Sequence, residues 1–362
     1  MPPHPPYAVS GRGCVVTDTT GHQVIDCNNN YTALLHGHAH PALVAAATEG
    51  IATGSAFGLP TESEVVCAEL LRSRTGLPHW RFCNSGSEAV MMAVRGARAA
   101  TGRDLLVRFS GSYHGTYDAV VDATAPGVPA GVAGTVVVLP QGDPDTFEQV
   151  MASRGGEIAA VLIDLMPNRA GLRPADPAFV DLVRQQTRQH GALLIVDEVI
   201  TFRLEVGGLH QRYGLQPDLV TLGKVVGGGF PVGAVGGRTE VLDSFHPLSE
   251  GRVAWGGTFS ANPVTMRAGT AALRMFDAAQ VVALNARGDR LRSQLAEGGV
   301  AVAGSGSLLR LLLVDPVHDW WRLYARGVLT GTNGLIALST AMTDDDVDAV
   351  RDAVLDALPE AG

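Results

Sequence analysis

One side chain, Lys224, has the most specific chemical potential in this sequence. The chain contains 27 lysine and arginine residues, and subtracting this single lysine leaves 26 arginines. An arginine guanidinium stays charged, whereas a lysine amine can lose its proton and condense with a carbonyl group. Lys224 follows the apolar run 219–222 and precedes the glycines at 227–229. Because a solvated position would accept arginine, we predict a chemical role for Lys224 and not a surface position.

Other polar residues also follow apolar runs that are typical of β-strands. The runs 80–83, 105–109, 161–163, 193–196 and 219–222 lead, in this order, to Ser85-Gly86-Ser87, Tyr113, Asp164, Asp197 and Lys224. Helical patterns alternate with these runs, which indicates a mostly parallel sheet. Ligands of open α/β sheets bind at the carboxyl ends of the strands. We therefore predict that these side chains meet at one edge of the sheet.

The segment Ser85-Gly86-Ser87 stands at the start of a helical pattern that continues to Arg95. Free N–H groups, two hydroxyls and a glycine that permits close approach could bind a phosphate. The same residues also suit an ordinary N-cap. The sequence leaves both interpretations open.

Asp197 ends a wholly apolar run, so its charge needs a partner inside the protein. A protonated pyridine nitrogen would serve, and so would an arginine. Tyr113 suits either a position flat against a planar ring or a place in the core. Val199, two residues after Asp197, would cover the other face of such a ring. Together with Lys224 and a phosphate-binding turn, these residues describe a site for pyridoxal phosphate.

Histidines invite two further interpretations. In a strand, His36, His38 and His40 would share one face, as metal ligands do. No nearby carboxylate or cysteine completes such a site, so we predict no metal there. His114 directly follows Tyr113, and we interpret it as a support for the site in preference to a general base.

Composition argues against several classes of protein. The formal net charge of −9 disfavours nucleic acids and anionic membranes as partners. No apolar run approaches the roughly 20 residues of a membrane span, and residues 1–6 do not resemble a signal peptide. The four cysteines lack CxxC spacing, which favours free thiols in a reducing cytoplasm. Only 17% of the residues are charged, which suggests that a partner chain covers part of the surface.

Six segments, in the same order along nearly the whole chain, resemble one known family. They are similar to the class III pyridoxal-phosphate-dependent aminotransferases of fold type I, in the branch near glutamate-1-semialdehyde aminomutase. The matching segments are 28–41, 84–89, 112–115, 190–199, 221–233 and 256–263.

The resemblance implies an α/β fold, with a large domain whose mostly parallel seven-stranded sheet is flanked by helices and a smaller α+β domain. The implied division assigns residues 1–48 and 266–362 to the small domain and residues 49–265 to the large, cofactor-binding domain. It also implies a homodimer with shared active sites, in which Thr258 reaches the phosphate of the neighbouring subunit's cofactor.

The resemblance further implies a role for each site residue. Lys224 would hold pyridoxal phosphate as a Schiff base and move the proton between the substrate Cα and the cofactor. Asp197 would keep the ring nitrogen protonated. Tyr113 and Val199 would cover the two faces of the ring, with His114 beside them. The residues that would bind the phosphate are Ser85, Gly86 and Ser87.

Departures from the family pattern bear on the substrate. Segment 115–135 is short where mutases of this branch carry a long gating loop, which favours an aminotransferase over a mutase. Segment 166–171, Met-Pro-Asn-Arg-Ala-Gly, resembles that of aminotransferases acting on β-amino acids. A family asparagine that contacts the phenolic oxygen of the cofactor is replaced near Arg169 or shifted to Asn168. The arginine with which relatives often bind a substrate carboxylate precedes residue 1, and Arg12, Arg169 and Arg203 are candidates to replace it.

We therefore predict a pyridoxal-phosphate-dependent aminotransferase that moves an amino group from an amino acid to a keto acid or aldehyde. The alternatives are an aminomutase, a decarboxylase or racemase of the same fold, and a non-catalytic binding module. Retention of both Lys224 and Asp197 argues against the binding module.

Overall fold

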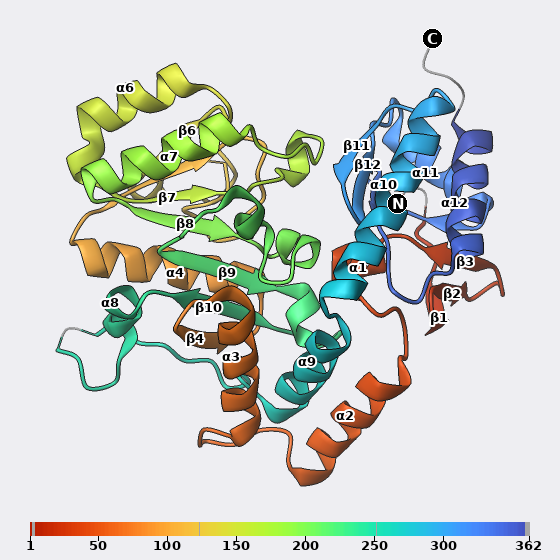
Figure 1. Cartoon of the computed structure of the whole chain (residues 1–362), viewed down its shortest axis with the longest axis horizontal. Helices are drawn as coiled ribbons and strands as arrows, with labels where there is room; N and C mark the ends of the chain where they lie inside the picture. The colour runs from red at the N-terminus through yellow and green to blue at the C-terminus, as the bar shows by residue number, and fades with distance from the viewer. Residues whose placement is uncertain (2–3, 123, 251, 359–362) are drawn as a thin grey trace.

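The computed structural model describes residues 1, 4–122, 124–250 and 252–358, which form two lobes (Figure 1). The larger lobe is built around a seven-stranded sheet with the order β4-β10-β9-β8-β7-β5-β6. β10 runs antiparallel to both of its neighbours and the other pairs are parallel, so all strands except β10 share one direction. The predicted mostly parallel seven-stranded sheet is confirmed. In sheet order the strands are His79–Cys83, Gly233–Gly237, Leu219–Gly223, Leu193–Asp197, Ile158–Ile163, Leu105–Phe109 and Val136–Leu139.

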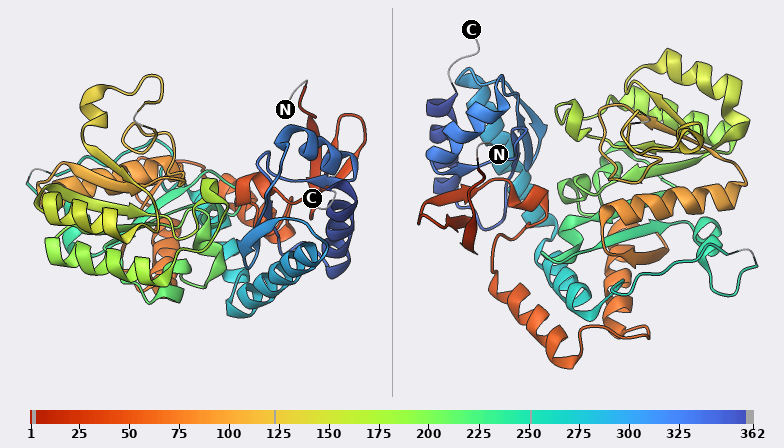
Figure 2. Two further views of the ribbon diagram at one scale, coloured as in Figure 1. Left: turned by 90° about the horizontal axis from the view of Figure 1, so that it is seen from above. Right: turned by 180° about the vertical axis from the view of Figure 1, so that it is seen from behind.

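The central strands are apolar at nearly every position because helices cover both faces of the sheet. All residues of β7 are buried. Val161 and Ile163 belong to the core under one layer of helices, whereas Ala160 and Leu162 belong to the core on the opposite face. The first layer contains α6 (Pro144–Arg154) and α7 (Pro177–His190), and the second contains α4 (Gly86–Thr101), as Figure 2 shows from two further directions.

Four helices begin where aspartate or asparagine precedes proline. In each of them the capping side chain accepts a backbone N–H, and proline at the first helical position needs no N–H partner. The four caps are Asp143 of α6, Asp176 of α7, Asn262 of α9 (Pro263–Met275) and Asp315 of α11 (Pro316–Ala325).

The smaller lobe combines the two ends of the chain. Its four-stranded sheet has the order β1-β2-β3-β13, and β13 pairs parallel with β3 across some 300 residues of sequence. A second, antiparallel sheet has the order β11-β12-β14. The predicted smaller α+β domain is confirmed, and the residue boundaries expected for the two domains stay a prediction. The strands are Ala8–Arg12, Val15–Asp18, Gln23–Asp26 and Val328–Leu329, and Val302–Ser305, Leu308–Leu311 and Leu335–Ala337; the main helices are α10 (Ala278–Glu297) and α12 (Asp344–Ala357).

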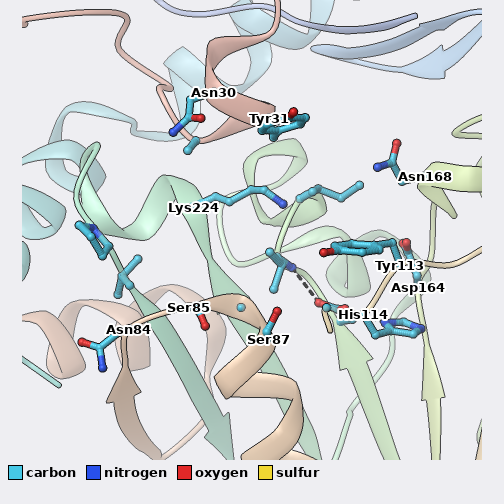
Figure 3. A pocket seen from close by; sticks show the side chains of 18 of the residues that line it. Asn30, Tyr31, Asn84, Ser85, Ser87, Tyr113, His114, Asp164, Asn168 and Lys224 are labelled. Atoms are coloured by element: carbon cyan, nitrogen blue, oxygen red, sulfur yellow. Dashed lines mark hydrogen bonds and ion pairs between the residues drawn. The ribbon is translucent and has the colours of Figure 1, made fainter. Parts of the chain in front are cut away.

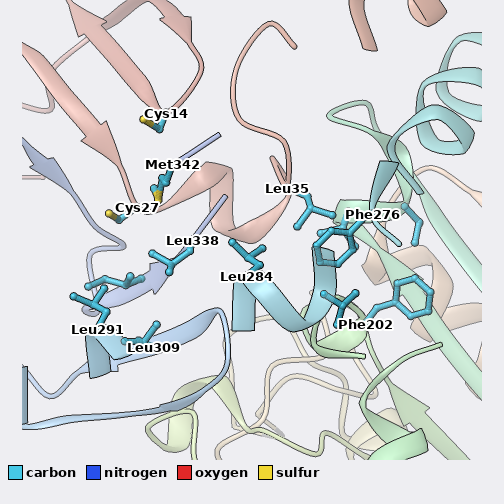
Figure 4. Close-up of a cluster of buried hydrophobic side chains, with 14 of the residues drawn as sticks. Cys14, Cys27, Leu35, Phe202, Phe276, Leu284, Leu291, Leu309, Leu338 and Met342 are labelled. Carbon is cyan, nitrogen blue, oxygen red and sulfur yellow. The ribbon is translucent and has the colours of Figure 1, made fainter. Parts of the chain in front are cut away.

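One apolar core continues from the smaller lobe into the larger one. Phe202 and Phe276 pack at its end in the larger lobe, and Leu338 and Met342 lie in the smaller lobe (Figure 4). This shared core places the two lobes against each other, so residues of both can border one site. All four cysteines are free and buried, as the sequence predicts.

The remaining helices complete the described part of the chain. They are α1 (Asn29–Thr32), α2 (Pro41–Thr53), α3 (Glu62–Thr75), α5 (Ala130–Ala133) and α8 (Thr239–Leu242), with 3₁₀ helices η1 (Gly155–Glu157), η2 (Asn168–Ala170), η3 (Thr201–Leu204), η4 (Leu209–Tyr213), η5 (Lys224–Gly227) and η6 (Asp243–Phe245). Within the described residues, every helix is too short or too polar to cross a membrane.

Candidate active site

Residues that follow five strands of the large sheet line one cavity of about 380 Å³. They meet because β4, β5, β7, β8 and β9 run in the same direction and end at the same edge. Figure 3 shows this cavity, with Asn30 and Tyr31 on the side opposite the N-terminus of α4. The strand-end residues in the cavity wall are Ser85, Gly86, Ser87, Tyr113, Asp164, Asp197 and Lys224.

Lys224 enters the cavity from the end of β9, and its amine points inward in Figure 3. Its backbone φ of 49° is a conformation that a residue other than glycine adopts at a cost in free energy. Burial lowers the pKa of the amine, while the carboxylates of Asp197 and Asp164 act in the opposite direction. A lowered pKa raises the fraction of neutral, nucleophilic amine at neutral pH.

Asp197 is held in place by three hydrogen bonds. Its Oδ2 lies 2.7 Å from Nδ1 of His114. Its Oδ1 accepts the Thr221 hydroxyl at 2.9 Å and the N–H of Val199 at 3.1 Å. The sequence allows an arginine as the partner of Asp197, and the structure has His114 instead, because β5 and β8 both border β7 and the segments that follow them meet. This bond gives His114 the means to support the carboxylate.

A second buried carboxyl group, that of Asp164, lies in the same wall. Burial and the nearby Asp197 raise the pKa of Asp164 to about 7. Its Oδ1 accepts the N–H of Met166 at 2.9 Å. Asp164 can therefore hold a proton at neutral pH, an ability that its position at a strand end does not reveal in the sequence.

The N-terminus of α4 faces the cavity. Ser85 caps the helix, with its hydroxyl oxygen accepting the N–H of Glu88 at 3.1 Å, so the N-cap interpretation is confirmed. The first-turn N–H groups of Gly86 and Ser87 have no acceptor within a helix, and both residues line the cavity. A Cβ on Gly86 would lie 3.0 Å from both Val199 methyl groups, so glycine permits this close approach. The cap thus leaves the predicted anion-binding groups free.

Tyr113 and Val199 both line the cavity. Tyr113 is 42% exposed, which contradicts the alternative of a core tyrosine. Between Asp197 and Val199, Glu198 turns into the protein, where it accepts the N–H groups of Leu209 and His210. This alternation along the chain places Val199 on the cavity side.

Asn30 and Tyr31 belong to the cavity wall although the sequence does not single them out as site residues. Residues 29–32 all have positive φ, from 49° to 79°, which is a left-handed turn. The Asn28 side chain accepts the N–H of Tyr31 at 2.8 Å, and Asp26 accepts that of Asn29 at 2.8 Å. Asparagine tolerates the left-handed region better than most residues, so the three consecutive asparagines are the signal for this turn.

The three arginines considered for a substrate carboxylate have different surroundings. Arg12 is exposed on β1 of the smaller lobe. Arg203 is fully buried and donates to the Ser307 hydroxyl at 3.1 Å and to the carbonyl of Leu338. Arg169 is exposed, and its guanidinium carbon lies 4.6 Å from the ring centroid of Tyr113, which lines the cavity. Among the described residues, Arg169 is the only one of these three arginines with a side-chain contact to a residue of the cavity wall, Tyr113.

A fourth arginine, Arg310, is not predicted as a site residue from the sequence. It lies on β12, is 6% exposed, and donates to Asn168, which lines the cavity. The sequence signal for Arg310 is its place inside the apolar run 308–314, because a charged residue in such a strand is buried.

Two other candidates lie away from these groups. Thr258 is exposed and, among the described residues of its own chain, is not part of the cavity wall. His36 bonds to Thr340 at 2.8 Å and His38 to Asp26 at 2.7 Å. Within the described residues, no group of three histidine, cysteine or acidic side chains could hold a metal ion.

The residues present fit pyridoxal phosphate. A pyridinium ring needs a carboxylate to accept its N–H, side chains to cover its faces and an amine to condense with its aldehyde. The cavity offers Asp197, then Tyr113 with Val199, and Lys224 for these parts. A phosphate needs unpaired donors, which the glycine-bearing start of α4 provides. The donor set therefore matches the cofactor that the sequence predicts.

Comparison with known proteins agrees with this geometry. The model of the family described as aminotransferase class-III matches residues 3–346. The chain belongs to the class-III aminotransferases. Among curated members of this family, it is 40% identical to a glutamate-1-semialdehyde 2,1-aminomutase of Methanothermobacter thermautotrophicus over 304 residues, which cover 81% of this chain and 72% of the relative.

Two solved structures are similar to this chain over nearly its whole length. An omega-transaminase from Sphaerobacter thermophilus is 41% identical with a TM-score of 0.95, covering 99% of this chain and 91% of its own. A beta-phenylalanine aminotransferase from Variovorax paradoxus is 34% identical with a TM-score of 0.91, covering 98% of this chain and 87% of its own. The resemblance stated from the sequence is confirmed.

Proposed function

We propose that this class-III enzyme is a pyridoxal-phosphate-dependent aminotransferase that moves an amino group from an amino acid, including β-amino acids, to a keto acid or aldehyde. The observation that carries the proposal is the presence of Lys224, Asp197 and the open N-terminus of α4 in one cavity. When bound, the cofactor supplies an electron sink for chemistry at the carbon that bears the amino group.

Each site residue has a defined role in this proposal. Lys224 would hold the cofactor through Nζ. Once the amino group of the substrate has taken its place, the released neutral amine of Lys224 would take the proton from the substrate Cα. Asp197, oriented by His114, would accept the N–H of the protonated ring nitrogen. Tyr113 and Val199 would cover the two faces of the ring, and Ser85, Gly86 and Ser87 would bind the phosphate.

A panel of amino donors tests the proposed function. The purified protein loaded with pyridoxal phosphate should convert its cofactor to the pyridoxamine form with a donor alone, which the cofactor's absorbance reports. A keto acid should then restore the original spectrum. If no donor of the panel produces a spectral change or an amino product with any acceptor, the protein does not catalyse transamination.

An aminomutase is the second candidate, because curated relatives carry that name. A mutase needs one substrate and a transferase needs two. Incubation with glutamate-1-semialdehyde alone should therefore leave it unrearranged if the protein is a transferase. Movement of its amino group from C2 to C1 without a second substrate would favour the mutase. The short segment 115–135 supports the transferase.

We further propose a homodimer in which Thr258 contacts the phosphate in the partner's site. Its exposure in the single chain supports this placement. Since a ligand bound across two chains stabilises their association, removing the cofactor should weaken the dimer. Thr258→Ala should raise the dissociation constant of the cofactor by roughly tenfold, the loss of one charge-assisted hydrogen bond. A monomer in sedimentation that retains cofactor and activity would contradict the shared site.

A further inference from the structure

Arg310 is a buried cation without an acidic partner. It is 6% exposed, and burial alone lowers its pKa to about 10. In the described part of the chain, no aspartate or glutamate forms an ion pair with it. Burying a guanidinium without a counter-ion is costly. Because Arg310 donates to Asn168, which lines the cavity, an anion bound in the cavity could supply the missing negative charge.

Arg310 fixes the orientation of the Asn168 side chain. Its Nη2 donates to the carbonyl oxygen of Asn168 at 2.6 Å and also to Oδ1 of the same residue, while Nη1 donates to the carbonyl of Asn333 at 2.6 Å. Because arginine can only donate, Asn168 must turn Oδ1 toward Arg310, which leaves its Nδ2 group for other acceptors.

The free amide group of Asn168 borders the cavity. Asn168 lines the cavity, and Figure 3 shows it above Tyr113, with its amide nitrogen on the side of Lys224. Ser85 and Ser87 lie across the cavity from it. An acceptor bound to Asn168 would therefore be separate from a phosphate at the start of α4.

A second positive charge lies on the same turn, η2. The guanidinium of Arg169 rests on the ring of Tyr113, and no described acidic residue forms an ion pair with Arg169. Asp164, a carboxyl group of the same cavity wall, has a pKa of about 7 and so is partly neutral at neutral pH. This end of the cavity thus favours a negatively charged group.

We propose that Asn168 and Arg310 form the subsite that binds the carboxylate of the substrate. The proposal rests on the proposed aminotransferase function. Asn168 donates to the carboxylate directly, and Arg310 is a positioning residue that orients the amide and supplies positive charge behind it. The substrates that this subsite selects are amino acids and the oxo acids paired with them, in preference to amines that carry no carboxylate.

Paired substrates test the subsite. Each amino acid that the wild-type enzyme accepts is compared with the amine in which a methyl group replaces the carboxylate, for example 3-amino-3-phenylpropanoate with 1-phenylpropylamine. The ratio of their kcat/KM values in the first half-reaction isolates recognition of the carboxylate. Arg310→Met should lower this ratio about 10- to 100-fold, the range for a lost hydrogen bond to a charged group.

Asn168→Asp provides a variant that keeps the fold. An aspartate can still accept from Arg310, but it removes the donor and places a negative charge at the subsite. The ratio should fall at least as far as in Arg310→Met, while the melting temperature should stay at or above that of the wild type. An unchanged ratio in both variants would overturn the proposal.

Arg203→Met is the matched control. Arg203 is also a buried arginine without an acidic partner, and it also links the lobes through Ser307 and Leu338. Its loss should lower stability but leave the ratio unchanged. If Arg203→Met and Arg310→Met reduce both members of a substrate pair equally, Arg310 acts only as a structural link and the subsite is wrong.

Binding of an unreactive carboxylate separates this proposal from the proposed function. Calorimetry with 3-phenylpropanoate on the cofactor-loaded protein should show binding that weakens about tenfold or more in Asn168→Asp. If the wild type binds it in this manner but transfers no amino group from any donor, the function is wrong and the subsite stands. If the wild type transaminates but both variants bind 3-phenylpropanoate as tightly as the wild type does, the subsite is wrong.

Discussion

The two sides of the cavity are built in different ways. One side, which we call the floor, consists of residues that follow parallel strands of the large sheet: Ser85, Gly86, Ser87, Tyr113, Asp164, Asp197, Val199 and Lys224. The other side, which we call the roof, consists of Asn30, Tyr31 and Asn168, which lie on a left-handed turn and a 3₁₀ turn. The floor is anchored in a sheet covered on both faces, whereas the roof depends on contacts with the smaller lobe.

This difference separates reaction type from substrate choice. In the proposed function, the floor groups bind the ring and phosphate of the cofactor and move a proton, which every donor requires. In the proposed subsite, Asn168 of the roof binds the carboxylate, which some donors lack. Asn29 donates to the carbonyl of Ala337 at 2.6 Å, and Asn168 accepts from Arg310, so both roof segments are fixed by strands of the smaller lobe. Changes in the floor should stop the reaction, and changes in the roof should alter its selectivity.

The largest effect is expected for Lys224 on the floor. Lys224→Arg keeps a positive charge but cannot attach the cofactor, so turnover should be abolished. The variant should lose the absorbance of the covalently bound cofactor. After treatment with borohydride, no cofactor should remain covalently attached to it. Arg203→Met serves as a control that keeps both signals. A fully active Lys224→Arg enzyme would remove the basis of the proposed function.

The next largest effect is expected for Asp197. Asp197→Asn should still bind the cofactor through Lys224 and the start of α4, but a neutral amide no longer keeps the ring nitrogen protonated. Single-turnover measurements should show the chemical step slowed by about 10² or more.

A graded control comes from Thr221, whose hydroxyl donates to Asp197 Oδ1 at 2.9 Å. Thr221→Val removes one hydrogen bond and leaves the charge, so it should slow the same step by roughly tenfold or less. Equal rates for Asp197→Asn and wild type would show that this carboxylate does not serve the ring.

The floor could be predicted from the sequence because it follows a local rule. An apolar run followed by a polar residue marks a strand end, and parallel strands bring such ends together, as they do for Asp197 and Lys224. The partner of Asp197 could not be predicted in the same way, since His114 reaches it from another strand, 83 positions away.

The roof could not be predicted, because its contacts join distant segments. Asn168 and Arg310 are 142 positions apart and belong to different lobes. No periodicity links them, and the pairing depends on how β12 packs against the turn after β7. The run of asparagines at 28–30 and the arginine inside the run 308–314 are signals of unusual positions, but neither identifies its partner.

A smaller effect, on stability, is expected for Asp164 of the floor. Its pKa is raised from 3.8 to about 7 in the folded chain, so folding takes up a proton between these values and stability falls as pH rises through this window. Asp164→Asn removes this dependence and can still accept the N–H of Met166. Without cofactor, its stability gain over the wild type should grow from pH 4 to pH 7 and then level off, reaching on the order of a few kcal/mol. Denaturant unfolding at pH 5 and pH 8 measures it, and an equal gain at both would contradict the raised pKa.

The smallest effect is expected in the roof, at Asn30, whose φ is 49° and ψ is 62°. A Cβ disfavours this conformation, so Asn30→Ala should be less stable than Asn30→Gly by about 1 kcal/mol. The exposed helical residue Ala45 of α2 is the matched control, because there glycine should be less stable than alanine by a similar amount. Opposite signs at the two sites, measured by denaturant unfolding, would show that the left-handed turn is costly. If Asn30→Ala and Asn30→Gly are equally stable, the left-handed turn of the roof carries no such strain.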